Sequence, residues 1–415
     1  MAFARTLSGM GQARTALVIG GGIIGVSSAF ALAQNGWRVR IVDARAGIAE
    51  GASLGNGRQL SYSHTSALAS PAILAQSPRL LFGCDDAFRF RPRMDGGFAR
   101  WAAEFLANCT NKAHKKNTLE TLQLAEQSRS MMERVLTRFP IAFDHKVSGK
   151  LVILRGDREL QSARRSMETK RKAGLDQHLL SPSEARDIEP ALERLDEEFL
   201  GALYSPDDAT GDCHAFAKGL FETGKREFGM QFRGQAKVER VIPRNGQQIV
   251  ALECGEELAA DLVVIANGHQ VNGLLKPLGH WLPIEPMKGY SFTAPIGNAA
   301  PIASVTDQKR RIVFTNLGDR MLVAGIAEMG RMDNQIDPSR LRSMIDAARE
   351  CLPEAAVYDQ ADMGWVGLRP MTPNSQPITR MIEPGIAVNG GHGMLGWTLA
   401  MGSAERLAAL VDQAA

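Results

Sequence analysis

The chain has 415 residues, of which 44% are hydrophobic and 22% are charged, and its formal net charge at pH 7 is +3. These values are typical of a soluble globular protein with about two or three domains, and so small a charge gives no reason to expect a nucleic-acid partner. The five cysteines are odd in number and never form a CxxC pair, so they predict neither a disulfide framework nor a metal site. We expect residues 1–13 to form a flexible leader and no segment to span a membrane. The expected compartment is the cytoplasm, with peripheral contact at the inner face of the cytoplasmic membrane as an alternative.

The first predicted element is a βαβ unit over residues 16–43. It consists of an apolar strand, a glycine turn, a helix of small residues and a second strand that ends at Asp43. In this motif Gly20 permits a tight turn, Gly22 lets the backbone approach a pyrophosphate, and Gly25 lets the helix pack close to the sheet. Asp43 is expected to bind ribose hydroxyls. Because the strand, helix and acid all accompany the glycines, the pattern predicts a dinucleotide site.

The rest of the chain alternates between helical and extended patterns. The glycine- and serine-rich residues 51–66 are suited to a ligand-binding loop. A second block of the nucleotide-binding domain is expected from about Phe199, and the strands from 290 onward indicate a separate antiparallel sheet. Helices are expected at 98–110, 117–139, 157–173, near Ser183, and at 214–228, 338–351 and 394–412, and strands at 150–155, 262–266, 290–294, 311–315, 321–326 and 386–389.

A second glycine cluster, Gly391, Gly393 and Gly396, follows a short strand and opens the last helix. Too few residues follow it for another strand with a ribose-binding acid, so it is not a second nucleotide fold. A helix N-terminus favours negative charge, which predicts contact with the N1 and C2=O edge of a flavin. The alternative is a helix start that needs glycine only for close packing.

Several further blocks carry a resemblance to a known family. Together with the N-terminal glycine motif, the chain resembles, nearly end to end, the bacterial FAD-dependent D-amino acid dehydrogenases of the D-amino acid oxidase and glycine oxidase superfamily. The blocks are Gln59–Tyr62, Ser205–Cys213, Met287–Thr293, Val323–Glu328, Trp365–Pro373 and Gly390–Thr398.

The resemblance implies a mixed α/β (α+β) fold with two domains. One is a Rossmann-like FAD-binding domain that is discontinuous in sequence, and the other is a substrate domain with an antiparallel sheet and flanking helices. We expect the FAD-binding domain to comprise residues 14–66, 180–282 and 362–415, and the substrate domain 67–179 and 283–361.

The resemblance also implies the substrate-binding residues. Arg369, in a Gly-Leu-Arg-Pro segment, is expected to bind the substrate carboxylate, for which a planar guanidinium offers two parallel hydrogen bonds. A buried ion pair between domains is the alternative. Tyr62, His64 and Tyr290 are candidates for hydrogen bonds to the substrate and for help in removing an ammonium proton, although half-buried packing would also explain tyrosines here.

The expected cofactor is FAD, held non-covalently because no cysteine lies in the block Trp365–Pro373, and no metal is expected. The residues expected to bind it come from the N-terminal motif, the following loop, two central positions and the last glycine cluster. They are Gly20, Gly22, Ile23, Ile24, Gly25, Asp43, Ala44, Arg45, Ser53, Asn56, Gly57, Gln59, Leu60, Ser61, Val238, Gly268, Gly391, His392, Gly393, Met394, Leu395, Gly396, Trp397 and Thr398.

The activity implied is oxidation of a D-amino acid by hydride transfer from its α-carbon to flavin N5, giving a 2-oxo acid and ammonia after hydrolysis, with electrons passed to a quinone-type acceptor. Alternatives on the same fold are a D-proline or hydroxyproline (imino acid) dehydrogenase and an oxygen-using D-amino acid or glycine oxidase. From other classes, an NAD-dependent dehydrogenase and a non-catalytic flavoprotein stay open.

Two segments depart from the family pattern. The basic run at Asp307–Arg311 replaces an acidic and aromatic segment, so it is either a solvated turn or a bias of the pocket against cationic side chains. Pro78–Arg93 interleaves aromatic residues with arginine, which suits either an anionic bilayer surface or a loop over the active site.

Overall fold

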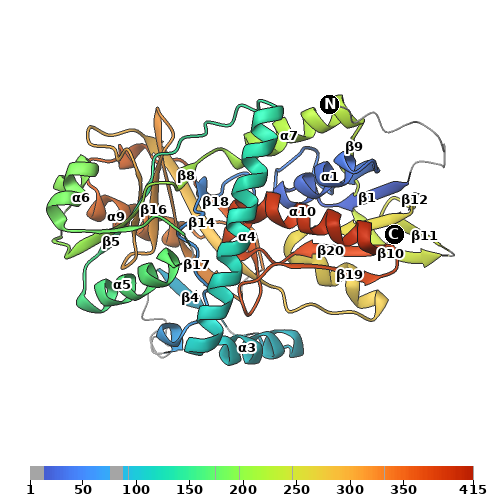
Figure 1. Ribbon diagram of the computed structural model, residues 1–415, viewed down its shortest axis with the longest axis horizontal. Helices are drawn as coiled ribbons and strands as arrows, with labels where there is room; N and C mark the ends of the chain where they lie inside the picture. The colour runs from blue at the N-terminus through green and yellow to red at the C-terminus, as the bar shows by residue number, and fades with distance from the viewer. Residues whose placement is uncertain are drawn as a thin grey trace.

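The computed structural model describes residues 14–74, 87–91, 93–172, 174–195, 197–244, 246–330 and 332–414. Figure 1 shows an elongated molecule in which two sheets lie side by side, with the long helix α4 (Asn111–Arg138) crossing in front between them. No helix in these ranges is long and apolar enough to cross a membrane.

The first sheet has six strands and carries the N-terminal βαβ unit. Five strands are parallel and β19 is an antiparallel edge, in the order β19-β20-β13-β1-β2-β9. Its central strands are apolar and buried, as parallel strands covered on both faces require. The strands are β1 (Thr15–Ile19), β2 (Arg38–Val42), β9 (Gln231–Arg233), β13 (Leu262–Ile265), β19 (Ile378–Glu383) and β20 (Ile386–Gly390).

Helices cover one face of this sheet and a small antiparallel sheet covers the other. The two faces have separate apolar cores. The helices are α1 (Ile23–Gln34), α7 (Cys213–Phe228) and α10 (Gly396–Ala414), and the small sheet consists of β10 (Val238–Arg244), β11 (Gln247–Leu252) and β12 (Glu257–Ala260).

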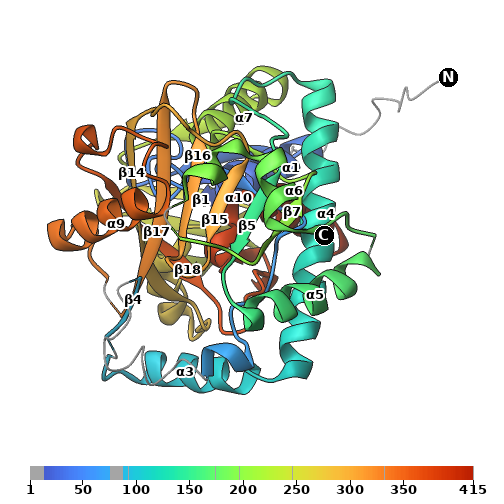
Figure 2. The ribbon, with the colours of Figure 1, turned by 90° about the vertical axis from the view of Figure 1, so that its left-hand side faces the viewer.

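The second sheet has nine strands and is mixed. Its neighbours are antiparallel except for the pairs β5 with β15 and β4 with β17, which are parallel. In Figure 2, α9 lies against one side of this sheet, where it contacts β14 and β17. The strands are β4 (Phe88–Phe90), β5 (Lys150–Leu154), β6 (His178–Leu180), β7 (Gly201–Ser205), β14 (Glu285–Pro295), β15 (Ser304–Asp307), β16 (Ile312–Asn316), β17 (Arg320–Met329) and β18 (Trp365–Met371).

The remaining elements connect or flank the two sheets. Several of the longer helices begin at an aspartate, serine or threonine whose side chain accepts a backbone N–H bond, as at Thr110, Ser181 and Asp212. These elements are α3 (Gly96–Asn108), α5 (Asp157–Arg171), α6 (Pro182–Ile188), α8 (Val271–Leu275), α9 (Pro338–Cys351), β3 (Gln59–Leu60), β8 (Ala209–Thr210), and the 3-10 helices η1 (Pro190–Arg194), η2 (Gly268–Gln270), η3 (Lys276–Leu278), η4 (Tyr358–Gln360) and η5 (Gly393–Leu395).

Two strands join a different sheet from the one expected. The strand after Phe199 exists as β7, but it pairs with β5 and β6 in the nine-stranded sheet. Likewise β18, which falls within the expected FAD-binding segment 362–415, pairs with β14. The chain crosses between the sheets at the short ribbon of β3 and β8. The boundaries expected at 180 and 362 therefore do not follow sheet membership, because the apolar pattern of a strand does not reveal its partner.

Candidate active site

A large cavity lies between the two sheets and is lined by residues of both. Its volume is about 3810 Å³. Sites for single small molecules measure roughly 300–1,000 Å³, so this cavity has room for a dinucleotide and a second small molecule. At one side it is lined by the glycine turn after β1, and at the other by Arg369 of β18.

The glycine turn after β1 requires glycine at two positions. Gly20 has φ +111°, and a Cβ there would lie 2.6 Å from the carbonyl oxygen of Ala266. A Cβ at Gly25 would overlap the carbonyl oxygen of Gly20. Gly22 is the N-cap of α1, and the nearest atom to a Cβ there is Ser53 Oγ at 3.6 Å. The N-terminus of α1 therefore meets the cavity, with the Ser53 hydroxyl accepting the Ile23 N–H at 3.1 Å, and it suits a pyrophosphate.

Asp43 lies at the end of β2, beside this turn. One carboxylate oxygen accepts a hydrogen bond from the Gly21 N–H at 2.6 Å, and the other accepts one from the Arg45 N–H at 2.7 Å. An ionised carboxylate has about four acceptor positions, so lone pairs stay available on the cavity side. Asp43 can therefore brace the turn and accept from ribose hydroxyls together.

The second glycine cluster forms the start of α10. Gly391 and Gly393 have φ of +75° and +55°, which leads the chain from β20 through η5 into the helix. Between them, the buried His392 places its Nε2 2.8 Å from Ser403 Oγ. Burial lowers the pKa of His392 to about 3, so its imidazole is neutral. The N-terminus of α10 faces the cavity, and the neutral histidine adds no positive charge that would compete with it for an anionic group.

Most of the expected cofactor residues line this one cavity. Gly25, Leu60 and Gly391 do not: Leu60 is fully buried in the core, and the two glycines shape the backbone. The expected residues that do line it are Gly20, Gly22, Ile23, Ile24, Asp43, Ala44, Arg45, Ser53, Asn56, Gly57, Gln59, Ser61, Val238, Gly268, His392, Gly393, Met394, Leu395, Gly396, Trp397 and Thr398.

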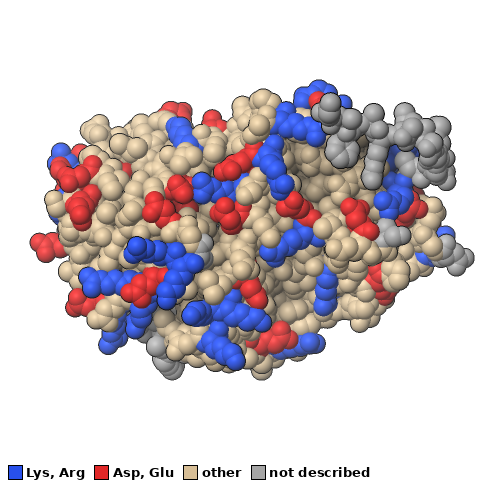
Figure 3. All heavy atoms as spheres, in the orientation of Figure 1, with Lys and Arg blue, Asp and Glu red and all other residues tan. Residues whose placement is uncertain are grey.

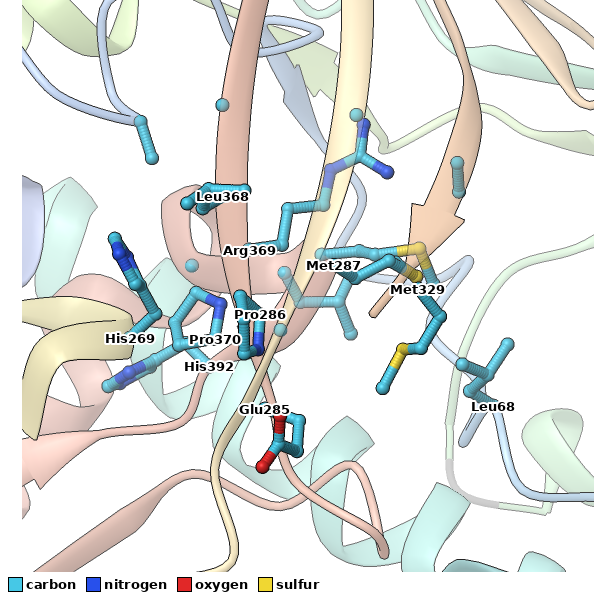
Figure 4. A pocket seen from close by; sticks show the side chains of 18 of the residues that line it. Leu68, His269, Glu285, Pro286, Met287, Met329, Leu368, Arg369, Pro370 and His392 are labelled. Atoms are coloured by element: carbon cyan, nitrogen blue, oxygen red, sulfur yellow. The ribbon is translucent and has the colours of Figure 1, made fainter. Parts of the chain in front are cut away.

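Arg369 extends from β18 across the neighbouring strand. Its guanidinium lies over Gly289 of β14, where any Cβ would overlap it. Figure 4 shows the side chain at the wall of the cavity. Burial lowers the pKa of Arg369 to about 10, so it is protonated at neutral pH, and no charged residue of the described ranges offsets that burial. The alternative of an ion pair between domains therefore finds no acidic partner there.

The other three substrate candidates differ in their position relative to the cavity. Tyr62 is only 5% exposed, packs in the core beside the six-stranded sheet and does not line the cavity, so the structure places it apart from the other candidates. Tyr290 lines the cavity, but its hydroxyl donates to Glu328 at 3.2 Å, and burial raises its pKa to about 12. His64 lines the cavity, and burial with nearby Lys150 holds its pKa well below 6.5.

Residues around Arg369 that sequence reasoning missed include Glu285, Met287 and Met329. The alternation of side chains along β14 is a usable signal, because positions 285, 287 and 289 share one face. Part of the basic run Asp307–Arg311 has a structural partner. Asp307 is buried and accepts a hydrogen bond from Arg310.

Comparison with known proteins agrees with this geometry. The family described as FAD dependent oxidoreductase (DAO) matches residues 15–410. "D-amino acid dehydrogenase 2" of Ralstonia nicotianae is 36% identical over 96% of both chains, and "D-amino acid dehydrogenase" of Paramagnetospirillum magneticum is 37% identical over 95% of this chain and 94% of its own. Among solved structures, glycine oxidase from Bacillus cereus has a TM-score of 0.73 at 21% identity, covering 96% of this chain and 95% of its own. L-proline dehydrogenase from P. horikoshii has a TM-score of 0.75 at 20% identity, covering 97% and 94%. The chain belongs to the family of FAD dependent oxidoreductases.

Proposed function

We propose that this protein oxidises D-amino acids to imino acids, which hydrolyse to 2-oxo acids and ammonia. The observation that carries the proposal is Arg369, a half-buried guanidinium with no acidic partner in the described ranges, at the wall of the cavity that also contains the dinucleotide cradle. A carboxylate ligand would neutralise this buried charge through paired hydrogen bonds. The names of the relatives, D-amino acid dehydrogenases at 35% to 37% identity, support the substrate class.

FAD would bind non-covalently along the cavity. The N-terminus of α1 would hold its phosphates, Asp43 its ribose, and the N-terminus of α10 the pyrimidine edge of its flavin ring. When bound, FAD supplies a hydride acceptor, which takes up the α-hydrogen of the substrate together with two electrons.

The protein's own residues contribute orientation more than acid–base chemistry. Arg369 fixes the substrate carboxylate, which limits the directions in which the α-hydrogen can point. The Tyr290 hydroxyl already donates to Glu328, and the low pKa of His64 makes it a weak base. The substrate ammonium group is therefore proposed to lose its proton to water before the oxidation step.

The electron acceptor is proposed to be a quinone-type molecule. The relatives are named dehydrogenases, which supports an acceptor other than oxygen. Two alternatives on the same fold are an oxygen-using oxidase and an imino acid dehydrogenase, because glycine oxidase and L-proline dehydrogenase share the fold.

Peripheral contact with an anionic membrane is also proposed. Residues 78–86 and 92 of the segment expected to make it lie outside the described ranges. Support comes from a basic surface at the beginning of α4 and on α5, seen in the lower left and lower middle of Figure 3. It is formed by the exposed residues Lys112, Lys115, Lys116, Arg158, Arg164, Arg165 and Arg171. Co-sedimentation with phosphatidylglycerol vesicles at low salt tests it, and equal binding to neutral vesicles would contradict it.

The main test is an anaerobic absorbance screen of the purified holoenzyme against D-amino acids, their L-enantiomers and cyclic imino acids. We expect bleaching of the flavin by D-amino acids, followed by faster reoxidation with a soluble quinone analogue than with air. A colourless protein that binds NADH, or a yellow one that no D-amino acid bleaches, would contradict the proposed function. Faster reoxidation in air would favour the oxidase alternative.

A further inference from the structure

Directly opposite residues on four neighbouring strands form a row that starts at Arg369. Arg369 of β18 pairs with Met287 of β14, Met287 with Met329 of β17, and Met329 with Phe90 of β4. Opposite residues share one face of a sheet and lie about 5 Å apart. Figure 4 shows the side chains of Arg369, Met287 and Met329 in succession. We call Met287, Met329 and Phe90 the apolar row.

The guanidinium of Arg369 lies beside this row. It reaches along the sheet face to Gly289, which is two residues from Met287 on the same strand and therefore about 7 Å away on the same face. The cross-strand neighbour of Gly289 is Ala327, also a small residue. The small residues leave room for the guanidinium, and a carboxylate bound to Arg369 thus has an apolar surface next to it.

Aromatic residues extend the apolar row away from Arg369. The ring centroids of Phe90 and Phe98 are 5.8 Å apart, those of Phe98 and Trp101 6.4 Å, and those of Trp101 and Phe105 5.1 Å. Trp101 is held in place by a 2.9 Å hydrogen bond from its Nε1 to the carbonyl oxygen of Met371. These residues form a cluster separate from the cores of both sheets, and most of its members line the cavity.

The charged groups beside this apolar surface are joined by ion pairs. Glu285 lies two residues before Met287 and appears below it in Figure 4. Its carboxylate accepts from Arg93 at 3.0 Å, and Arg93 also contacts Asp95 at 2.8 Å. This carboxylate is therefore held by Arg93, away from the apolar row.

We propose that the apolar row binds the substrate side chain, and that the protein prefers D-amino acids with long unbranched or aromatic apolar side chains over D-alanine and over charged ones. This inference rests on the proposed function, which places the substrate carboxylate on Arg369. Two methionines suit the task because their flexible thioethers adapt to side chains of different shape and contact aromatic rings favourably.

The first test compares D-alanine, D-2-aminobutyrate, D-norvaline and D-norleucine as anaerobic reductants of the holoenzyme. A buried methylene contributes about a fourfold gain, so kcat/KM is expected to rise roughly 60-fold from D-alanine to D-norleucine. If D-alanine reduces the flavin but the series is flat, the inference is wrong while the proposed function stands. If no D-amino acid reduces it, the proposed function is wrong.

Variants of one residue in the apolar row locate the effect. Met329→Ala is expected to lower kcat/KM for D-norleucine about tenfold and to leave D-alanine within about twofold, whereas Met329→Leu should retain most of the preference. The matched control is Met363→Ala, because Met363 is 86% exposed and does not line the cavity. An equal loss for both substrates in Met329→Ala, with normal flavin content, would overturn the assignment.

A binding measurement makes the inference testable without turnover. Propanoate, pentanoate and heptanoate cannot be oxidised at an amine, and their binding is read from the change in flavin absorbance. The Kd is expected to fall about fourfold for each added methylene in the wild type, and by a smaller factor in Met329→Ala. This slope would support the apolar row even if no D-amino acid proved to be a substrate. A Kd independent of chain length would overturn it.

Discussion

Two arginines of this protein, one buried and one half-buried, differ in what surrounds their charge. Arg340, in α9, is 1% exposed, and its Nε donates to Glu328 at 3.1 Å behind the nine-stranded sheet. Arg369, in β18, has desolvation as the sole influence on its lowered pKa, and its guanidinium meets the cavity on the opposite face. The first charge has an acidic partner in the fold, whereas the second has none in the described ranges and lies where the proposed substrate carboxylate would bind.

The difference has an energetic meaning. A buried ion is costly unless a partner of opposite charge and good geometry accompanies it. The fold supplies such a partner to Arg340 in Glu328. At Arg369 the same penalty is carried by the protein without ligand, which is the arrangement expected of a binding residue. Variants at the two positions should therefore fail in opposite ways.

The largest effect is expected from Arg369→Leu. Losing the partner of a buried carboxylate typically costs about 4 kcal/mol, so the rate of flavin reduction at low D-amino acid concentration should fall about 10³-fold. Flavin content should be unchanged, and urea unfolding should show equal or greater stability because an unpaired buried cation is removed. Arg369→Lys keeps the charge without the paired donors, so its rate of flavin reduction should lie between those of the wild type and Arg369→Leu. Near-normal reduction by Arg369→Leu would refute the carboxylate role.

Arg340→Leu should reverse this pattern. It removes the buried charged hydrogen bond between Arg340 and Glu328, which is expected to lower the free energy of unfolding by about 2 kcal/mol in urea titrations. The double variant Arg340→Leu with Glu328→Leu should recover part of the loss, since it removes both charges. A stability equal to wild type in the single variant would show that the pair does not stabilise the fold.

A third case lies between these two, because two buried lysines share one buried carboxylate. Lys150 donates to Gln59 at 2.9 Å, Lys170 donates to the Ser63 carbonyl at 2.9 Å, and Asp208 attracts both. Burial lowers the pKa of each lysine to about 8. Between pH 8 and about 10.4 each lysine therefore binds more protons in the unfolded chain than in the folded one, so the contribution of this pair to stability rises with pH.

Lys150→Met tests this case. The wild type should gain about 2 kcal/mol of unfolding free energy relative to the variant between pH 8 and pH 10, because the variant lacks one of the two titrations. Unfolding in urea at several pH values measures the difference. Lys112→Met, at an exposed lysine of α4, is the matched control and should show no such dependence. A constant gap between wild type and Lys150→Met would contradict the lowered pKa.

Local sequence patterns predicted much of the fold and the cofactor end of the cavity. The glycine turn after β1 and the cluster before α10 lie where their spacing placed them, because each conformation depends on residues close in sequence. The membership of β7 and β18 in the nine-stranded sheet and the burial of Tyr62 could not be read in this way. Both depend on which strands pair across long sequence separations, as does the row from Arg369 to Phe90.

The smallest effect is expected from Tyr290→Phe. This variant tests whether the Tyr290 hydroxyl belongs to the Glu328–Arg340 pair or contacts the substrate. Its hydroxyl donates to the same Glu328 oxygen as Arg340, so the side chain belongs with the structural pair. Removing one hydrogen bond from a carboxylate that keeps its arginine should cost about 1 kcal/mol of unfolding free energy. Flavin reduction by D-amino acids should stay within about threefold of wild type in anaerobic stopped-flow measurements. A loss approaching that of Arg369→Leu, with stability unchanged, would instead place the hydroxyl at the substrate and join Tyr290 to the ligand-binding face.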